Sequence, residues 1–183
     1  MAQHVPSGSG EPITIQRITP YGEGARVELS CSAFPPNGAI PLRNSAYGDN
    51  HSPPLQWTAI PGAKAWALIL EDPDAPREEP FLHWMIWNIP GDVTSLPENL
   101  AKTARLDRPQ GAIQGRNDSG SIGYFGPRPP ANDGLHRYHF QLFALGEPLH
   151  FGPNATLQEV VSALKGDVIA QADLIGLFEQ RTQ

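Results

Sequence analysis

Alternating apolar and polar positions indicate that this chain is built mainly from β-strands. Along residues 25–33, apolar and polar side chains alternate with a period of two, which is the pattern of a strand with one buried face. Residues 137–145 are rich in aromatic side chains and are followed by a glycine, so they give the clearest strand of the chain. Shorter apolar runs predict three more strands of a central sheet, at 55–58, 66–70 and 84–89.

One helix has clear sequence signals near the C-terminus. Thr156 and Glu159 form a capping box, in which each side chain can bond the backbone amide of the other residue. The apolar stripe of this helix consists of Leu157, Val160, Val161 and Leu164. Gly166 is a suitable residue for the C-terminal end of this helix. We expect a second short helix at 167–172 and a last strand near 174–178, which together predict a mainly β fold with short helices, including C-terminal helices.

Length and composition favour a single domain. The chain has 183 residues, enough for one hydrophobic core, and its 20 prolines and 18 glycines are spread between the strand-like runs. Residues 1–10 have the composition of a flexible lead-in, so we expect one domain at 11–183. The turn-rich stretch at 34–54 is predicted to be a long loop within that domain.

Charge and targeting signals argue against several classes of function. A formal net charge of -6 and a pI near 5.4 disfavour nucleic-acid binding. Cys31 is the only cysteine, so no disulfide can form within the chain. No apolar run approaches the length of a membrane-spanning helix, and the N-terminal residues lack the pattern of a secretion signal. We therefore expect a cytoplasmic protein without stable membrane insertion.

Two acids and a histidine cluster at the ends of two predicted strands. Pro73 biases Asp72 away from the helical conformation, which predicts that this segment is extended. Residues two apart on an extended chain point to the same side, so Asp72 and Asp74 are expected to face one pocket. Pro76 follows in the same loop, and His83 begins the next strand-like run. Loops that leave strand ends are common places for binding sites.

A second candidate group comes from the glycine- and proline-rich stretch at 120–130 and the strand that follows it. Glycines allow backbone amides to approach a ligand closely, and prolines stiffen the turns that hold those amides. His136 and Tyr138 are two residues apart at a strand start, so their side chains should point to one side. Acids, imidazoles, a phenol and backbone amides can therefore converge on one small polar ligand.

Each of these residues also has a structural interpretation. Asp-Pro pairs are ordinary turn chemistry, and a histidine at a strand start can be a satisfied part of the core. Two aspartates and two histidines have suitable donor types for a divalent metal, but their spacing fits no compact metal motif, so we expect no metal and no cofactor. A hydrolase of a small ester or phosphoester, using Ser121 with His83 or His136, is the alternative function, although no nucleophile-elbow pattern supports it.

Taken together, these motifs resemble those of the phosphatidylethanolamine-binding protein (PEBP) family. The resemblance rests on Asp72-Pro-Asp-Ala-Pro76, His83-Trp84, the Gly-Tyr-x-Gly-Pro-x-Pro-Pro pattern at 123–130, and His136-Arg-Tyr138 before an aromatic strand. The segments 38–41 and 52–57 fit the same family, and the bacterial and archaeal Raf kinase inhibitor-like branch, of YbhB/YbcL type, is the most similar. The resemblance covers about residues 25–180.

The resemblance implies a fold, a pocket and a class of function. The fold is a large central antiparallel β-sheet packed against a smaller sheet, with a small anion pocket at the sheet edge. The ligand-binding residues that it implies are Asp72, Asp74, Pro76, His83, Gly123, Tyr124, Gly126, Pro127, His136 and Tyr138. Of the backbone amides, we expect that of Gly126 to face the anion. The implied function is non-enzymatic binding of a phosphorylated or head-group-like small ligand.

The resemblance also implies classes of partner. Relatives engage phospholipid head groups, protein kinases or proteases through the pocket or its rim, where Phe125 and Arg128 are expected. These roles stay open alternatives, as does a homodimer seeded by Phe125, because a fold does not determine a partner. Two pocket acids would repel a bare anion and suit a zwitterion, so we expect phosphoethanolamine-like ligands rather than free phosphate.

Overall fold

The computed structural model describes residue 8 and residues 10–182, and this part of the chain contains two β-sheets and one α-helix. Most of the predicted lead-in at 1–10 lies outside the described residues. The elements in chain order, with η for a 3-10 helix, are η1 (Thr14–Arg17), β1 (Leu29–Cys31), β2 (Gly38–Ala39), η2 (Leu42–Asn44), β3 (Leu55–Trp57), β4 (Ala65–Asp72), β5 (Phe81–Pro90), β6 (Ser95–Leu96), β7 (Ile113–Gln114), β8 (His136–Leu145), α1 (Leu157–Leu164) and β9 (Val168–Phe178).

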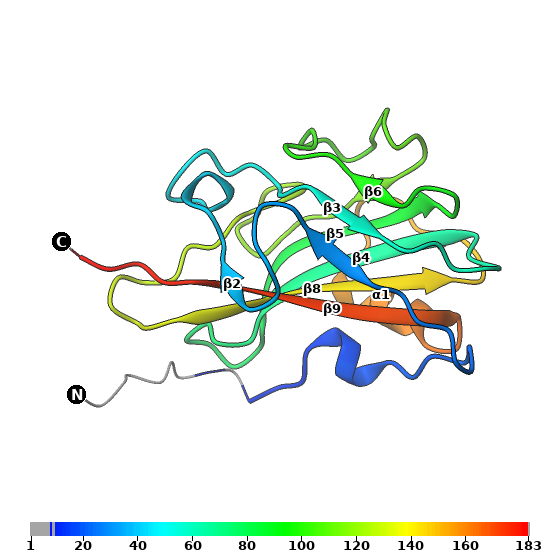
Figure 1. The fold of residues 1–183 in the computed structure, drawn as a ribbon, viewed down its shortest axis with the longest axis horizontal. Helices are drawn as coiled ribbons and strands as arrows, with labels where there is room; N and C mark the ends of the chain where they lie inside the picture. Colours follow the sequence, from blue (N-terminus) through cyan, green and yellow to red (C-terminus); the bar gives the residue numbers. More distant parts are fainter. Residues whose placement is uncertain (1–7, 9, 183) are drawn as a thin grey trace.

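The large sheet has six strands in the order β2-β9-β8-β4-β5-β7, and the small sheet has three in the order β1-β3-β6. Neighbouring strands are antiparallel in both sheets, except that short β2 runs parallel to β9. The four long strands β5, β4, β8 and β9 lie side by side, with β3 and β6 above them in the view of Figure 1. This arrangement confirms the predicted mainly β architecture of a large and a small sheet.

A hydrophobic core lies on each face of the large sheet. Alternate residues of β4 separate the two cores, because successive side chains of a strand point to opposite faces. On one face, Leu68 packs with Trp57 and other side chains of the small sheet. On the other face, Ile69 packs with Leu164 of α1, which lies behind β8 and β9 in Figure 1. The large sheet is therefore buried on both sides.

The C-terminal part contains one helix, and not the several that the sequence predicted. The capping box of α1 is confirmed, since the Thr156 hydroxyl accepts a hydrogen bond from the Glu159 amide at 3.2 Å. The predicted second helix at 167–172 is wrong, because β9 occupies that stretch. Strand β9 pairs with β8 from Val168 to Phe178. Ladder hydrogen bonds along this length outweigh the weak helix preference of a segment that contains alanine and glutamine.

Smaller elements also differ from the sequence prediction. The alternating stretch at 25–33 forms a strand only at Leu29–Cys31, although Val27 is buried as the alternation predicted. The stretch at 34–54 is mostly irregular, as expected, but it includes β2 and η2. Within the part of the chain that the structure describes, no helix is both long enough and apolar enough to cross a membrane.

Candidate functional site

The end of β4 lies beside the start of β8, and this brings Asp72 next to His136. Asp72 is the last residue of β4 and is 2% exposed, and His136 is the first residue of β8 and is fully buried. The His136 Nδ1 lies 2.8 Å from the Asp72 Oδ2. Because β4 and β8 are antiparallel neighbours, residues 64 positions apart meet at one sheet end. The predicted convergence of these two residues is confirmed.

A β-bulge positions His83 at the same place. Leu70 of β4 lies opposite Trp84 of β5. The next residue of β4 lies opposite Leu82, so His83 is an extra residue on β5. Bulges re-aim side chains, and they occur often beside functional sites. His83 therefore reaches the site cavity, while Leu82 packs into the core on the α1 side of the sheet.

Asp74 does not share the site with Asp72, so the prediction that both carboxylates face one pocket is wrong. The chain turns after Asp72 instead of staying extended, because the Asp74 amide donates to the Asp72 Oδ1 at 2.8 Å. The Asp74 carboxylate then binds Arg137 through its backbone amide, Nε and a terminal guanidinium nitrogen, at 2.8 to 2.9 Å. Burial alone would raise the pKa of Asp74, but the bonds from Arg137 lower it below its usual value.

His83 is held as a neutral ring. Its Nδ1 lies 2.7 Å from the Phe125 carbonyl oxygen, which can only accept, so Nδ1 carries the hydrogen. The side chain is 3% exposed, and this burial lowers the pKa of His83 in spite of the negative charge of Asp72. The Phe125 ring stacks on the imidazole at 5.7 Å. With the hydrogen on Nδ1, the Nε2 of the neutral ring carries a lone pair and is the acceptor of this ring.

His136 is held as a cation. In addition to Asp72, its ring contacts Asp133, whose Oδ2 lies 3.0 Å from Nε2. Burial alone would lower the pKa of His136, but the bonds and charge of Asp72, and then of Asp133, raise it above its usual value. Both ring nitrogens face carboxylate oxygens, so both donate. The site therefore contains two histidines whose pKa values are pushed in opposite directions.

Tyr138 lies behind the histidines and not on the cavity wall. Its ring meets that of His83 edge-on at 5.2 Å and stacks on that of His136 at 6.4 Å. It is fully buried, and burial, followed by the charge of Asp72, raises the pKa of its hydroxyl. That hydroxyl lacks a hydrogen-bond partner of ordinary geometry in the described part of the chain. Tyr138 therefore packs against both imidazole rings.

The glycine- and proline-rich stretch forms a wall, but the backbone amide that was expected to face an anion is already bonded within the protein. The Gly126 amide donates to the Asn50 Oδ1 at 2.7 Å, so the expectation that it faces an anion is wrong in this structure. An added Cβ at Gly126 would collide with the Asn44 carbonyl oxygen, which explains the need for glycine here. The Tyr124 hydroxyl donates to that same carbonyl at 2.6 Å. Backbone packing, and not ligand contact, accounts for these positions.

Two other residues that the sequence singled out in this stretch have structural contacts. The Gly123 carbonyl accepts from the Asn117 side chain at 2.9 Å, and Gly123 has a φ of 87°, which favours glycine. The Pro127 carbonyl accepts from the Ala46 amide at 3.0 Å, and Pro127 is buried. Neither residue lines the cavity beside the histidines.

The histidines open into a cavity of about 390 Å³, which we call the histidine cavity. Its walls come from the Asp72 loop, the start of β5, the loop at 118–119, the Phe125–Pro130 stretch and the start of β8. Of the residues predicted at a ligand, the four that line it are Asp72, Pro76, His83 and His136. Phe125 and Arg128, which were expected at the rim, line it as well.

Sequence reasoning missed four residues of this cavity, namely Arg77, Phe81, Asp118 and Ser119. The Arg77 guanidinium bonds the Asp118 Oδ2 at 3.0 Å and lies 5.4 Å from the centre of the Phe81 ring. Asp118 also accepts from the Leu82 amide at 2.9 Å, which fixes its loop to the edge of β5. Arg77 directly follows the Asp-Pro-Asp-Ala-Pro motif, and this adjacency is the signal that could have found it. Asp118 has no such signal, since it is 46 positions from Asp72 in sequence.

The chemistry that these residues support is binding of polar groups. Within residues 8 and 10–182, no group of three or more histidine, cysteine or acidic side chains is arranged to hold a metal ion. Ser121, the nucleophile of the alternative hydrolase, bonds Asn117 at 3.2 Å and lies 2.9 Å from Ser119. No described serine hydrogen-bonds to His83 or His136. The geometry gives the hydrolase alternative no activated hydroxyl.

The chain is similar to known proteins of one family. Residues 30–179 match the phosphatidylethanolamine-binding protein family. A UPF0098 protein of Methanothermobacter thermautotrophicus is 47% identical over 155 residues, which span 84% of this chain and 99% of that protein. CT736 of Chlamydia trachomatis, a putative PEBP homologue of known structure, is 34% identical with a TM-score of 0.76, covering 85% of this chain and 98% of that one.

The solved structure of Escherichia coli YbcL, described as a new member of the mammalian PEBP family, is 31% identical with a TM-score of 0.78. The alignment covers 86% of this chain and all of YbcL, since 100% of that chain is matched. Sequence and structure agree on the family, because the family match over residues 30–179 and the similarity to solved PEBP structures cover the same part of the chain. The chain therefore belongs to the PEBP family, in its prokaryotic UPF0098 branch of YbhB/YbcL type.

Proposed function

We propose that the histidine cavity binds a small phosphorylated ligand of head-group type, and that the protein binds this ligand without converting it. The observation that carries the proposal is that His83 and His136 share one cavity with Asp72 while their pKa values are shifted in opposite directions. A cavity of this kind offers a hydrogen-bond acceptor and positive charge within a small volume. A ligand that carries both a hydrogen-bond donor and an anionic group matches this cavity.

The acceptor side of the cavity consists of His83 and Asp72. Because His83 uses its Nδ1 hydrogen on a backbone carbonyl, its Nε2 presents a lone pair. Asp72 uses one oxygen for His136 and the other for the Asp74 amide, and its charge remains in the cavity wall. These groups favour an ammonium or a protonated phosphate oxygen, and they disfavour a bare anion.

The positive side of the cavity consists of two arginines. Arg77 shares its charge with Asp118, whereas Arg128 lies 5.6 Å from the centre of the Tyr47 ring and forms no ion pair with the described residues. Guanidinium groups suit phosphate oxygens because several N–H donors lie in one plane. A phosphoethanolamine-like group, with a phosphate toward Arg128 and an ammonium toward Asp72, fits both sides.

We propose a wider role for the same site, which is the binding of a macromolecule. The rim residues Phe125 and Arg128 offer an aromatic and a cationic contact to a macromolecule that presents the phosphorylated group. A phospholipid head group, a protein kinase and a protease are the partner classes implied by the family, and a homodimer through Phe125 is a further alternative. We favour the small-ligand role, because the cavity is a more specific feature than the rim.

Isothermal titration of the purified protein with phosphoethanolamine, phosphate and acetate tests the proposal. We expect saturable binding of phosphoethanolamine that is stronger than that of phosphate, with no binding of acetate. The variant His83→Ala should lose this binding, and His150→Ala, a change at an exposed histidine outside the cavity, should keep it. Circular dichroism should show both variants folded. Equal affinity for phosphate and phosphoethanolamine, or unchanged binding by His83→Ala, would contradict the proposal.

A further inference from the structure

A second and larger cavity lies on the other face of the large sheet. It has a volume of about 890 Å³ and lies between the N-terminal segment, the loop at 116–118 and the start of α1. We call it the Glu71 cavity. Among the described residues, it shares only Asp118 with the histidine cavity. Its floor is apolar and includes Leu82, Met85 and Val161.

Glu71 is the buried acid of this cavity. It precedes Asp72 on β4 and therefore points to the opposite face, where it is 2% exposed. Its Oε2 accepts two hydrogen bonds of 2.8 Å, from the Thr14 amide and from the Gln141 side chain. Its Oε1 accepts no hydrogen bond from the described residues, and Glu71 borders the cavity. One oxygen of a buried carboxylate is thus left for a ligand.

No cation of the described chain pairs with Glu71. Arg17 and Arg116 border the same cavity, but they donate to the backbone carbonyls of Pro12 and Gly120. Neither forms an ion pair with Glu71 within residues 8 and 10–182. A buried carboxylate without a counter-ion is unfavourable, and a bound cation would offset that cost.

We propose that the Glu71 cavity binds an aliphatic diamine or polyamine, with one primary ammonium on the Glu71 Oε1. The methylene stem lies on the apolar floor, as the stems of lysine side chains lie on apolar surfaces. Glu79 also borders the cavity and forms no ion pair with the described residues, so its carboxylate favours a second ammonium along the rim. This binding is independent of the phosphorylated ligand in the histidine cavity.

Isothermal titration of the full chain with pentane-1,5-diamine tests the inference, with pentane-1,5-diol as the uncharged control. We expect saturable binding of the diamine and none of the diol. Glu71→Gln keeps the size of the side chain and an oxygen for Thr14 and Gln141, and it should weaken diamine binding about tenfold or more. Glu28→Gln removes one negative charge at an exposed position outside the cavity and should leave the affinity unchanged.

A second variant keeps the inference testable if Glu71→Gln does not fold. Asn154→Lys changes an exposed residue on the cavity wall and places a competing ammonium there, so it should weaken diamine binding without removing buried contacts. Absence of diamine binding by the unmodified protein would overturn the inference. So would equal losses in Glu71→Gln and Glu28→Gln, or tighter binding of Nα-acetyl-lysine amide than of the diamine, which would point to a protein side chain as the ligand.

Discussion

The two faces of the large sheet use neighbouring acids, at the end of β4 and in the turn after it, for different purposes. Asp72 faces the histidine cavity and holds a histidine, whereas Glu71 and Asp74 face the other side and hold amides and Arg137. The chain turn after β4 sends Asp74 to the face that strand alternation already gives to Glu71. Acids one or two positions apart therefore serve separate sites.

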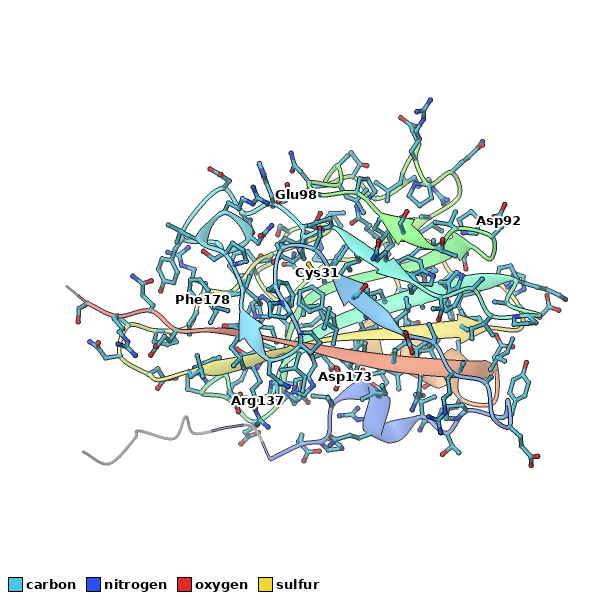
Figure 2. The ribbon with its side chains drawn as sticks, viewed as in Figure 1. Cys31, Asp92, Glu98, Arg137, Asp173 and Phe178 are labelled. Carbon is cyan, nitrogen blue, oxygen red and sulfur yellow. The ribbon has the colours of Figure 1, made fainter. Side chains whose placement is uncertain are left out.

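The start of β8 shows the same division. His136 faces Asp72, while His139 faces Asp173 of β9 at 2.8 Å on the opposite side. Figure 2 shows Arg137 and Asp173 on the same side of β8 and β9, toward the N-terminal segment. The difference between the faces is chemical as well as spatial. One face places two histidines with oppositely shifted pKa values at the histidine cavity, and on the other face Asp74 and Asp173 bond Arg137 and His139.

Removal of the Asp72 charge should have the largest effect. Asp72→Asn takes away the strongest partner of the buried His136 cation, so we expect a loss of about 3 kcal/mol in the free energy of unfolding. It should also weaken phosphoethanolamine binding about tenfold or more, because the ammonium loses its carboxylate. Urea unfolding and titration calorimetry measure the two effects. Asp92→Asn, at an exposed position, is the matched control and should show neither.

The equivalent change on the other face should affect stability alone. Asp74→Asn weakens the bonds from Arg137, whose side chain is 55% exposed, so solvent screens much of the interaction. We expect a loss of about 1 kcal/mol in the free energy of unfolding and unchanged ligand affinity. A large loss of phosphoethanolamine binding in this variant would show that the two faces are not separate.

The two cavity histidines should shape the pH dependence of stability in opposite ways. The pKa of His83 is lowered from 6.5, so the unfolded chain takes up its proton first, and stability is lost as the pH falls below 6.5. The pKa of His136 is raised from 6.5. Its contribution to stability is therefore complete below pH 6.5 and is lost as the pH rises through the pKa of the folded state.

Urea unfolding across the range of about pH 5 to 9 checks the predicted directions of these two effects on stability. His83→Gln should flatten the acid side of the stability profile, and His136→Gln should flatten the alkaline side. Flattening of the same side by both variants would contradict the assignment of one neutral and one charged ring.

The smallest effect is expected at the rim. Arg128→Ala removes an exposed cation that lies near the Tyr47 ring, so phosphoethanolamine binding should weaken only about threefold, and the salt dependence of binding should decrease. Calorimetry at low and high salt measures both. An unchanged salt dependence would mean that the phosphate end of the ligand does not approach Arg128.

Part of this division was readable from the sequence, although the expectation that Asp72 and Asp74 face one pocket was wrong. The alternation along 137–145 predicted which face Tyr138 takes, and the motifs that begin at Asp72 and His136 predicted that these residues meet. The helix predicted at 167–172 failed because its local residue preferences were overridden by pairing with a distant strand, a tertiary effect that short-range patterns do not contain.

The remaining parts of the site depend on geometry that residue types do not determine. The turn that separates Asp74 from Asp72 forms through one side-chain-to-amide bond, which competes with the extended conformation that Pro73 favours. The bulge that re-aims His83 follows from the pairing register of two strands. The use of the Gly126 amide by Asn50 joins segments 76 positions apart. None of these contacts follows from the local sequence.

The central claim is that His83 and His136 bind one ligand while His139, on the opposite face, does not. Imidazole ¹⁵N–¹H correlation spectra recorded during a titration with phosphoethanolamine test it most directly. We predict that the signals of His83 and His136 shift together and saturate at one concentration, and that those of His139 and His150 stay fixed. Unmoved signals from His83 and His136 at saturating ligand, or equal shifts at His139, would contradict the claim.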